Sequence, residues 1–180
     1  MKISCNSSGI IIYWSKYGCT KQYARWLHEK TGFKICAMSA PFAPSLKKAG
    51  VIIAGSSIRS GKLKIASWIR THWKDLKDKL VIVYSTSALS PEDSTLQEIW
   101  HKSLPSEIRM SCEYFPMPGR LIYSRLTILD KIKLWSDAMT SGDPEVEQGL
   151  KKGFNSMDIA ALSPILERVK IHTAKPGKKS

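Results

Sequence analysis

Three short polar segments follow apolar runs in this chain, and their side chains are suited to binding an anion. The first, SKYGCT (15–20), follows the apolar run GIIIYW and combines hydroxyl groups, a lysine and a glycine. A helical pattern begins directly after it, and the backbone amides of a helix N-terminus attract negative charge. The segment therefore indicates a phosphate site. A turn that merely caps the helix stays open as the alternative.

The other two polar segments have a similar character. SSIRSGKL (56–63) follows the apolar run VIIAG, and TSALSPED (86–93) follows LVIVYS. Each contains more hydroxyl-bearing and small residues than a plain connection needs. None of the three segments contains the GxxxxGK[ST] phosphate loop or the GxGxxG dinucleotide turn. Three such segments at one edge of a sheet are stronger evidence for a ligand site than any one alone.

Apolar runs alternate with amphipathic helical patterns along the chain. The expected strands are residues 9–14, 33–38, 51–55, 80–85 and 110–115. Helices are expected from about Thr20, from Lys64 and from Ser90, where Ser-Pro-Glu-Asp predicts a serine cap. The helix positions assigned to the core are Tyr23, Trp26, Leu27, Ile65, Ile69, Trp73, Leu76, Leu96, Ile99, Trp100 and Leu104.

Strands that are apolar on both sides are covered on both faces. The pattern therefore predicts an α/β fold, a doubly wound five-stranded parallel sheet with helices on both faces. In such sheets ligands bind beyond the carboxyl ends of the strands, where the three polar segments lie.

The charge of the chain is strongly positive and unevenly distributed. The net charge is +13 over 180 residues; residues 1–80 hold 15 basic and 3 acidic side chains, and residues 81–180 hold 13 and 12. The excess in the first half predicts an anionic partner, either a phosphate ligand, a membrane surface, a nucleic acid or an acidic protein. A solvated basic surface stays open as the alternative.

The four cysteines and four histidines are scattered, without CxxC or other metal-ligand spacing. Reduced thiols, a cytoplasmic location and no metal site are therefore expected. No apolar run approaches the ~20 residues of a membrane span. One domain is expected over residues 9–171, with an N-terminal extension (1–8) and a disordered basic tail (172–180).

The segment RLIYSRLTILDKIKLWSDAM (120–139) predicts a basic amphipathic helix. Its apolar residues at helical spacing are Ile128, Ile132, Trp135 and Met139, and its basic residues are Arg120, Arg125, Lys131 and Lys133. The favoured interpretation is a helix that covers the sheet. Contact with an anionic membrane surface, a hydrophobic substrate or a second subunit stays open.

The segments YWSKYGCTKQYARWL, VIIAGSSIRSGKL and VIVYSTSALSPED resemble the three flavin-contacting segments of flavodoxin-domain proteins. They are most similar to the branch that includes menaquinone-dependent protoporphyrinogen oxidase, with its S-x-x-G-x-T and I-R-x-G-K/H turns. FPMPGRL resembles the fifth strand of that family and LDKIKLWSDAMTSGD its later helix, and the likeness covers about residues 9–169. The resemblance implies a flavodoxin-like fold with FMN as cofactor.

The resemblance also implies which residues contact FMN, with its phosphate in the first segment and its ring between the other two. These residues are Ser15, Lys16, Tyr17, Gly18, Cys19, Thr20, Ser57, Ile58, Arg59, Ser60, Gly61, Ser85, Thr86, Ser87, Ala88 and Leu89. Arg59 would favour a negatively charged reduced flavin. Flavodoxins hold the ring between aromatic side chains, and neither of the two later segments supplies one. No catalytic residue is assigned.

The resulting hypothesis is an FMN-dependent oxidoreductase for electron or hydride transfer, in its most specific form a protoporphyrinogen oxidase-like enzyme with a quinone acceptor. One alternative is an electron carrier that docks on a redox partner protein. The other is a basic nucleic-acid-binding module without flavin, although the chain shows no nucleic-acid-binding motif. Peripheral contact with the inner face of the membrane and a homodimer are further expectations.

Overall fold

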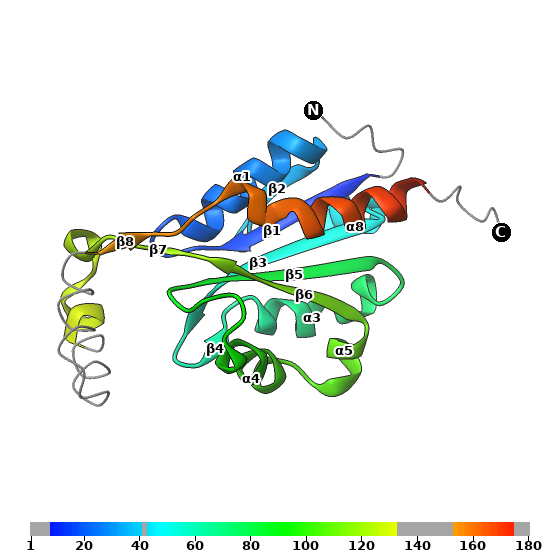
Figure 1. Cartoon of the computed structure of the whole chain (residues 1–180). Helices are drawn as coiled ribbons and strands as arrows, with labels where there is room; N and C mark the ends of the chain where they lie inside the picture. Colours follow the sequence, from blue (N-terminus) through cyan, green and yellow to red (C-terminus); the bar gives the residue numbers. More distant parts are fainter. Residues whose placement is uncertain (1–7, 41–42, 133–152, 175–180) are drawn as a thin grey trace.

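A parallel sheet with helices on both faces forms the centre of the molecule (Figure 1). The computed structural model describes residues 8–40, 43–132 and 153–174. The strands are β1 (Gly9–Trp14), β2 (Lys34–Ala37), β3 (Val51–Arg59), β4 (Lys62–Leu63), β5 (Leu80–Ser87), β6 (Cys112–Pro118), β7 (Arg120–Leu121) and β8 (Phe154–Asn155). The helices are α1 (Cys19–Thr31), α2 (Ala43–Lys48), α3 (Ala66–Leu76), α4 (Ser94–Ser103), α5 (Ser106–Met110) and α8 (Ser163–Ala174), with short 3-10 turns η1 (Tyr123–Arg125) and η2 (Ile159–Leu162).

The sheet has the strand order β2-β1-β3-β5-β6, and all four pairings along it are parallel. The short strand β4 is added antiparallel to the end of β3. The doubly wound five-stranded sheet predicted from the sequence is therefore confirmed. The chain reverses its direction of winding between β1 and β3, and such a reversal leaves a crevice at the carboxyl ends of the two strands.

Alternate residues of the central strands supply two separate cores. Ile10, Ile12 and Ile52 pack with α3 and α4 on one face. Ile11 and Ile53 pack with α1 and α8 on the other. Both faces are covered, which explains why the strands read as continuous apolar runs rather than alternating ones.

The predicted apolar faces of the helices are largely confirmed. Ten of the eleven helix positions assigned to the core are buried or half-buried in the two clusters, and the remaining one, Leu96 on α4, is 1% exposed. Helix α1 ends at Gly32, whose positive φ of 73° is easily adopted by glycine. Within the described residues, no helix is long and apolar enough to cross a bilayer.

The second polar segment is not the loop that the sequence suggested. The predicted strand 51–55 continues to Arg59, and the chain then turns back through Ser60 and Gly61 into β4. Both turn residues have positive φ, 51° and 66°, as a two-residue hairpin of this kind requires. The polar residues after Gly55 concealed the strand because the apolar run ends there: Ser56 is buried, whereas Ser57 and Arg59 are only half-buried.

Three further boundaries also differ from the prediction. Helix α4 begins after Asp93, whose carboxylate accepts a hydrogen bond from the Thr95 amide at 2.8 Å; Ser90 instead opens the preceding turn. The fifth strand is Cys112–Pro118 rather than 110–115, because residues up to Met110 belong to α5. Likewise α3 begins at Ala66, two residues after Lys64.

The segment 120–139 is not one continuous helix in its described part. It contains β7, η1 and a helical stretch over residues 128–132. Ile128, Leu129 and Ile132 are 76%, 78% and 61% exposed, so the favoured interpretation as a helix covering the sheet is wrong for these residues. Lys133, Trp135 and Met139 lie outside the described residues.

The expected ends of the domain are only partly within the described residues. Of the expected N-terminal extension, only Ser8 is described, and its hydroxyl donates to the Lys48 carbonyl at 2.6 Å. Helix α8 continues to Ala174, three residues into the expected tail.

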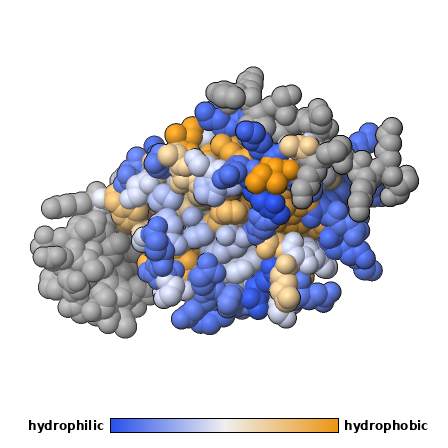
Figure 2. Space-filling view, turned by 45° about the vertical axis from the view of Figure 1, so that its right-hand side comes forward, coloured by the Kyte–Doolittle hydropathy of each residue, from blue (hydrophilic) through white to orange (hydrophobic). Residues whose placement is uncertain are grey.

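Hydrophilic side chains cover much of the face seen in Figure 2, with smaller apolar areas between them.

Candidate functional site

The first polar segment forms a tight turn between β1 and α1. Gly18 is the N-cap of α1 with a φ of 91° and has no side chain with which to cap the helix. Ser15 Oγ accepts a hydrogen bond from the Gly18 amide at 3.0 Å and so holds the turn closed. The first amides of an α-helix have no partner within the helix. At α1 they are left for a ligand, since no side chain of the described residues caps them.

Thr20 ties this turn to the third polar segment. Its side chain is buried, and its Oγ1 lies 2.8 Å from Thr86 Oγ1. The Tyr84 hydroxyl donates to the Thr20 carbonyl at 2.8 Å, and burial raises the pKa of that phenol, so it remains a donor. Thr20 thus has a positioning role in this structure, and its expected hydrogen bond to a phosphate stays a prediction.

The second segment brings hydroxyl groups and Arg59 to the crevice along β3. Ser56 Oγ accepts a hydrogen bond from the Ile65 amide at 3.2 Å and is fully buried. Ser57 Oγ is also buried, and among the described residues it has no hydrogen-bond partner. A buried hydroxyl without a partner is costly. The next residues, Ile58 and Arg59, lie beside it in the wall of the crevice.

The third segment is the end of β5 and the turn after it. Ser85 is buried, and its hydroxyl lies 2.7 Å from the Tyr114 hydroxyl on β6, so this side chain belongs to the interior of the fold. Thr86, Ser87 and Ala88 instead reach the crevice.

The three segments line one pocket with an empty volume of about 550 Å³, including space open to solvent. Eleven of the sixteen residues implied by the resemblance line the pocket: Ser15, Lys16, Tyr17, Cys19, Thr20, Ser57, Ile58, Arg59, Thr86, Ser87 and Ala88. The other five do not: Gly18, Ser60, Gly61, Ser85 and Leu89.

The rest of the lining comes from residues that the sequence did not indicate. They are Gly119, Arg120, Leu121 and Phe154, from β7, β8 and the residue before β7. A Cβ on Gly119 would lie 2.3 Å from the Ser87 carbonyl oxygen, so glycine permits the close approach of these two chains. Phe154 supplies an aromatic side chain that neither of the two later segments contains. The sequence contained a signal for the segment 119–121, because its glycine directly follows the fifth strand, at the edge of the sheet where ligands bind. It contained no such signal for Phe154.

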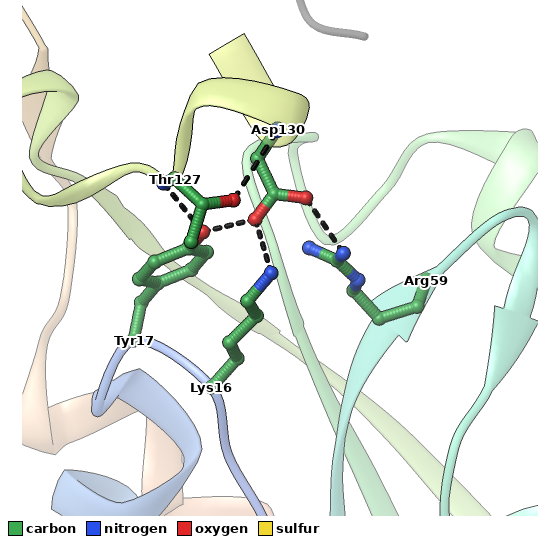
Figure 3. A network of polar contacts seen from close by, with 5 residues as sticks. All are labelled: Lys16, Tyr17, Arg59, Thr127 and Asp130. Carbon is green, nitrogen blue, oxygen red and sulfur yellow. Dashed lines mark hydrogen bonds and ion pairs between the residues drawn. The ribbon is translucent and has the colours of Figure 1, made fainter.

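A network of charged and polar groups lies beside the pocket, centred on Asp130 (Figure 3). One carboxylate oxygen accepts from Lys16 Nζ at 2.5 Å, and the other accepts from Arg59 Nη2 at 2.6 Å. The Tyr17 hydroxyl also donates to the carboxylate. The hydrogen bond from Arg59 lowers the pKa of Asp130 well below its usual range. The hydrogen bond to Asp130 raises the pKa values of Lys16 and Arg59, so all three groups are charged at neutral pH.

Comparison with known proteins places this architecture in a family. A family model described as a flavodoxin domain matches residues 10–146. The chain belongs to the flavodoxin-domain family. Its strand order and the crevice between β1 and β3 agree with that assignment. A search of curated proteins finds no match to this flavodoxin domain.

Solved structures similar to this flavodoxin domain share little sequence with it. The flavodoxin, WrbA-like protein from Agrobacterium tumefaciens is 17% identical with a TM-score of 0.51, over 93% of this chain and 99% of that one. Rubredoxin oxygen:oxidoreductase from Desulfovibrio gigas is 17% identical with a TM-score of 0.47, over 93% of this chain and 37% of that one. Oxidised Flavodoxin 1 from Bacillus cereus is 18% identical with a TM-score of 0.43, over 63% and 85%. At 17% identity, the likeness to the Agrobacterium tumefaciens protein bears on the fold alone.

The pocket of this flavodoxin domain fits a phosphate-bearing flavin in its chemistry. It combines the uncapped amides of α1, the cations Lys16 and Arg59, and the buried Ser57 hydroxyl, which has no partner in the described part of the chain. Leu121 and Phe154 add apolar surface. Among the described residues, no group of three His, Cys, Asp or Glu side chains could hold a metal ion.

Proposed function

We propose that this flavodoxin domain binds FMN non-covalently in the pocket at the carboxyl ends of β1, β3 and β5 and uses it for electron or hydride transfer. When bound, FMN supplies the redox chemistry, which is intrinsic to its ring system. The observation that carries the proposal is the N-terminus of α1. It is uncapped by any described side chain, opens at the reversal of the sheet and has Lys16 and Arg59 beside it.

The residues of the pocket divide between anchoring and tuning. The turn Ser15–Thr20 is suited to the phosphate, because backbone amides and a helix dipole stabilise an anion without bringing a counter-charge into the core. Ser57 has a hydroxyl available for a polar edge of the ring system. Arg59 places a positive charge at the same wall, where it stabilises negative charge on the ligand.

The reaction class follows from the cofactor and not from an acid–base pair, since the described residues that line the pocket include no histidine and no carboxylate. We propose an oxidoreductase, and as its most specific form a protoporphyrinogen oxidase-like activity with a quinone acceptor. That form is supported by the sequence of the first two turns. An electron carrier that docks on a redox partner protein is the alternative, and turnover with a soluble quinone distinguishes the two.

The proposal is tested by the visible absorption spectrum of the purified protein, with chromatographic identification of the released cofactor. The expected result is a flavin spectrum, from the isolated protein or after incubation with FMN, and release of FMN. A protein that acquires no flavin absorption at saturating FMN contradicts the proposal. Such a protein that also binds nucleic acid in a salt-dependent manner would support a basic binding module instead.

We also propose peripheral contact with an anionic bilayer, at the inner face of the membrane. The supporting observation is the exposed apolar face of residues 128–132, formed by Ile128, Leu129 and Ile132. Lys131 belongs to the same stretch, and its Nζ lies 5.0 Å from the centre of the Tyr123 ring. Apolar side chains next to basic ones suit the interface of an anionic membrane. These two features suit a cytoplasmic protein that reaches a quinone dissolved in the membrane.

A further inference from the structure

The carboxylate of Asp130 occupies an arrangement of donors of the kind that recognises an external anion. Lys16, Arg59 and Tyr17 converge on it from two strand-end segments that lie far from it in sequence (Figure 3). Its side chain is only 12% exposed, whereas those of Lys16 and Arg59 are 32% and 31% exposed. All three donor residues line the pocket, and Asp130 does not. The carboxylate therefore contacts the two lining cations without itself being part of the lining.

The backbone around Asp130 fixes the carboxylate in this position. Thr127 precedes the helical stretch 128–132, and its Oγ1 accepts from the Asp130 amide at 3.3 Å. The Thr127 amide donates to the Tyr17 hydroxyl at 3.2 Å. Tyr17 thus joins the turn Ser15–Thr20 to both Thr127 and Asp130. The apolar side chains of the helical stretch that carries Asp130 are exposed to solvent.

We propose that Asp130 is a positioning residue of the pocket, which holds Lys16 and Arg59 together and competes with an anionic ligand for their positive charge. The proposal rests on the FMN site proposed above and adds a determinant of how strongly that site binds anions. One negative charge lies between two positive charges, so an incoming phosphate or flavin meets a partly neutralised pair. Removal of the Asp130 charge, with the shape of the side chain retained, should strengthen anion binding.

The test compares Asp130→Asn with the wild type in two titrations at low ionic strength, one with inorganic phosphate and one with FMN. The expected result is tighter binding of both ligands by about fivefold or more, because an uncompensated pair of cations faces the pocket. Added salt should reduce this gain, since it screens charges that are partly exposed. Asp130→Glu, which keeps the charge, should remain close to the wild type.

A matched control removes a different carboxylate that also pairs with an arginine. Glu113 accepts from Arg168 Nε at 2.5 Å, and both residues lie outside the pocket lining. Glu113→Gln changes the net charge by the same amount and should leave both affinities unchanged. In an Arg59→Ala background the gain from Asp130→Asn should shrink, because one of the two cations is absent.

The proposal is overturned if Asp130→Asn binds phosphate no more tightly than the wild type, or if Glu113→Gln shows the same gain. Unfolding transitions of all variants are recorded first, and Asp130→Ser serves in place of an Asp130→Asn protein that does not fold. A gain for phosphate in a protein that binds no FMN would support Asp130 and contradict the FMN proposal. If the wild type binds FMN but Asp130→Asn binds phosphate and FMN no more tightly, the FMN proposal is supported and the Asp130 proposal is contradicted.

Discussion

Strand β3 changes character half-way along its length. From Val51 to Ala54 every side chain is apolar and 0% exposed. From Ser57 to Arg59 the side chains are a hydroxyl, an isoleucine and a guanidinium, and all three are half-buried. Strand β5 repeats the change, from the apolar run that begins at Leu80 to the hydroxyls that begin at Ser85. The same strands therefore supply the core with their first halves and the pocket with their ends.

This comparison indicates that stability and binding are carried by different residues of one element. Apolar burial in the first half contributes most of the favourable free energy of folding. The second half contains the buried Ser57 hydroxyl, which costs stability because it has no partner in the described residues, and one cation, Arg59, beside the pocket. Both features suit a ligand. Substitutions on either side of Gly55 should therefore separate the two properties.

The largest effect is expected for Ile53→Ala in the apolar half. Ile53 is 0% exposed and pairs with Ile11 and Ile82 on the two neighbouring strands. Its truncation should lower the free energy of unfolding by roughly 2–5 kcal/mol, measured by denaturant titration.

The matched substitution in the binding half is Ser57→Ala. It should change the free energy of unfolding by less than about 0.5 kcal/mol or raise it slightly, because the lost hydroxyl has no partner among the described residues. Its FMN affinity should fall. A loss of stability in Ser57→Ala comparable to that in Ile53→Ala would break the comparison.

The next largest effect is expected at the junction, for Gly55→Ala. A Cβ at this position would lie 2.2 Å from Tyr84 Cζ, and that ring is 0% exposed. Displacement of the ring should cost about 1–3 kcal/mol of unfolding free energy, as overpacking usually does. It should also weaken FMN binding, because the Tyr84 hydroxyl anchors Thr20 at the start of α1. Tyr84→Phe, which removes only the hydroxyl, is the control; wild-type stability in Gly55→Ala would show that the close packing is not required.

A smaller effect is expected for Arg59→Ala, and it should appear in the redox potential rather than in stability. Loss of a positive charge beside the flavin disfavours negative charge on the reduced cofactor, so the midpoint potential should fall. Since Arg59 is 31% exposed and shared with Asp130, about 1 kcal/mol is expected, or roughly 20 mV for a two-electron couple. Spectroelectrochemical titration measures the shift. An unchanged potential would remove Arg59 from the flavin environment.

The smallest effect concerns the exposed apolar face of residues 128–132, which is neither core nor pocket. Co-sedimentation should show weak binding to anionic vesicles at low salt and none to neutral vesicles, since each nearby basic residue contributes only about 1 kcal/mol. Ile128→Ser with Leu129→Ser should reduce this binding without changing the unfolding transition. Met110→Ser is the control, because Met110 is 88% exposed elsewhere. Absence of binding to anionic vesicles at low salt contradicts the membrane proposal.

The apolar half of each strand could be read from the sequence, and most of the binding half could not. Continuous apolar runs such as Val51–Ala54 identify strands covered on both faces. Beyond Gly55 the residues alternate between pocket, hairpin and interior, so no single period marks them as a strand. Ser85 shows the consequence: its neighbours Thr86 and Ser87 line the pocket, while its own hydroxyl pairs with Tyr114.

The remaining pocket residues depend on contacts between distant parts of the chain. Phe154 reaches the pocket because β8 pairs with β7, and Asp130 reaches Lys16 across 114 positions of sequence. A single phenylalanine or a single aspartate carries no local signal of such a role. The turn Ser15–Thr20 could be recognised because its function resides in the local backbone and in the helix that follows it.

The central claim, that this turn receives the phosphate of FMN, is tested most directly by equilibrium titration of the apoprotein with FMN and with riboflavin, which lacks the phosphate. The two ligands share the ring system, so the ratio of their dissociation constants isolates the contribution of the turn. The account predicts that FMN binds at least about tenfold more tightly, a difference of roughly 1.4 kcal/mol, and that added salt narrows the ratio. Equal affinities for FMN and riboflavin would contradict it.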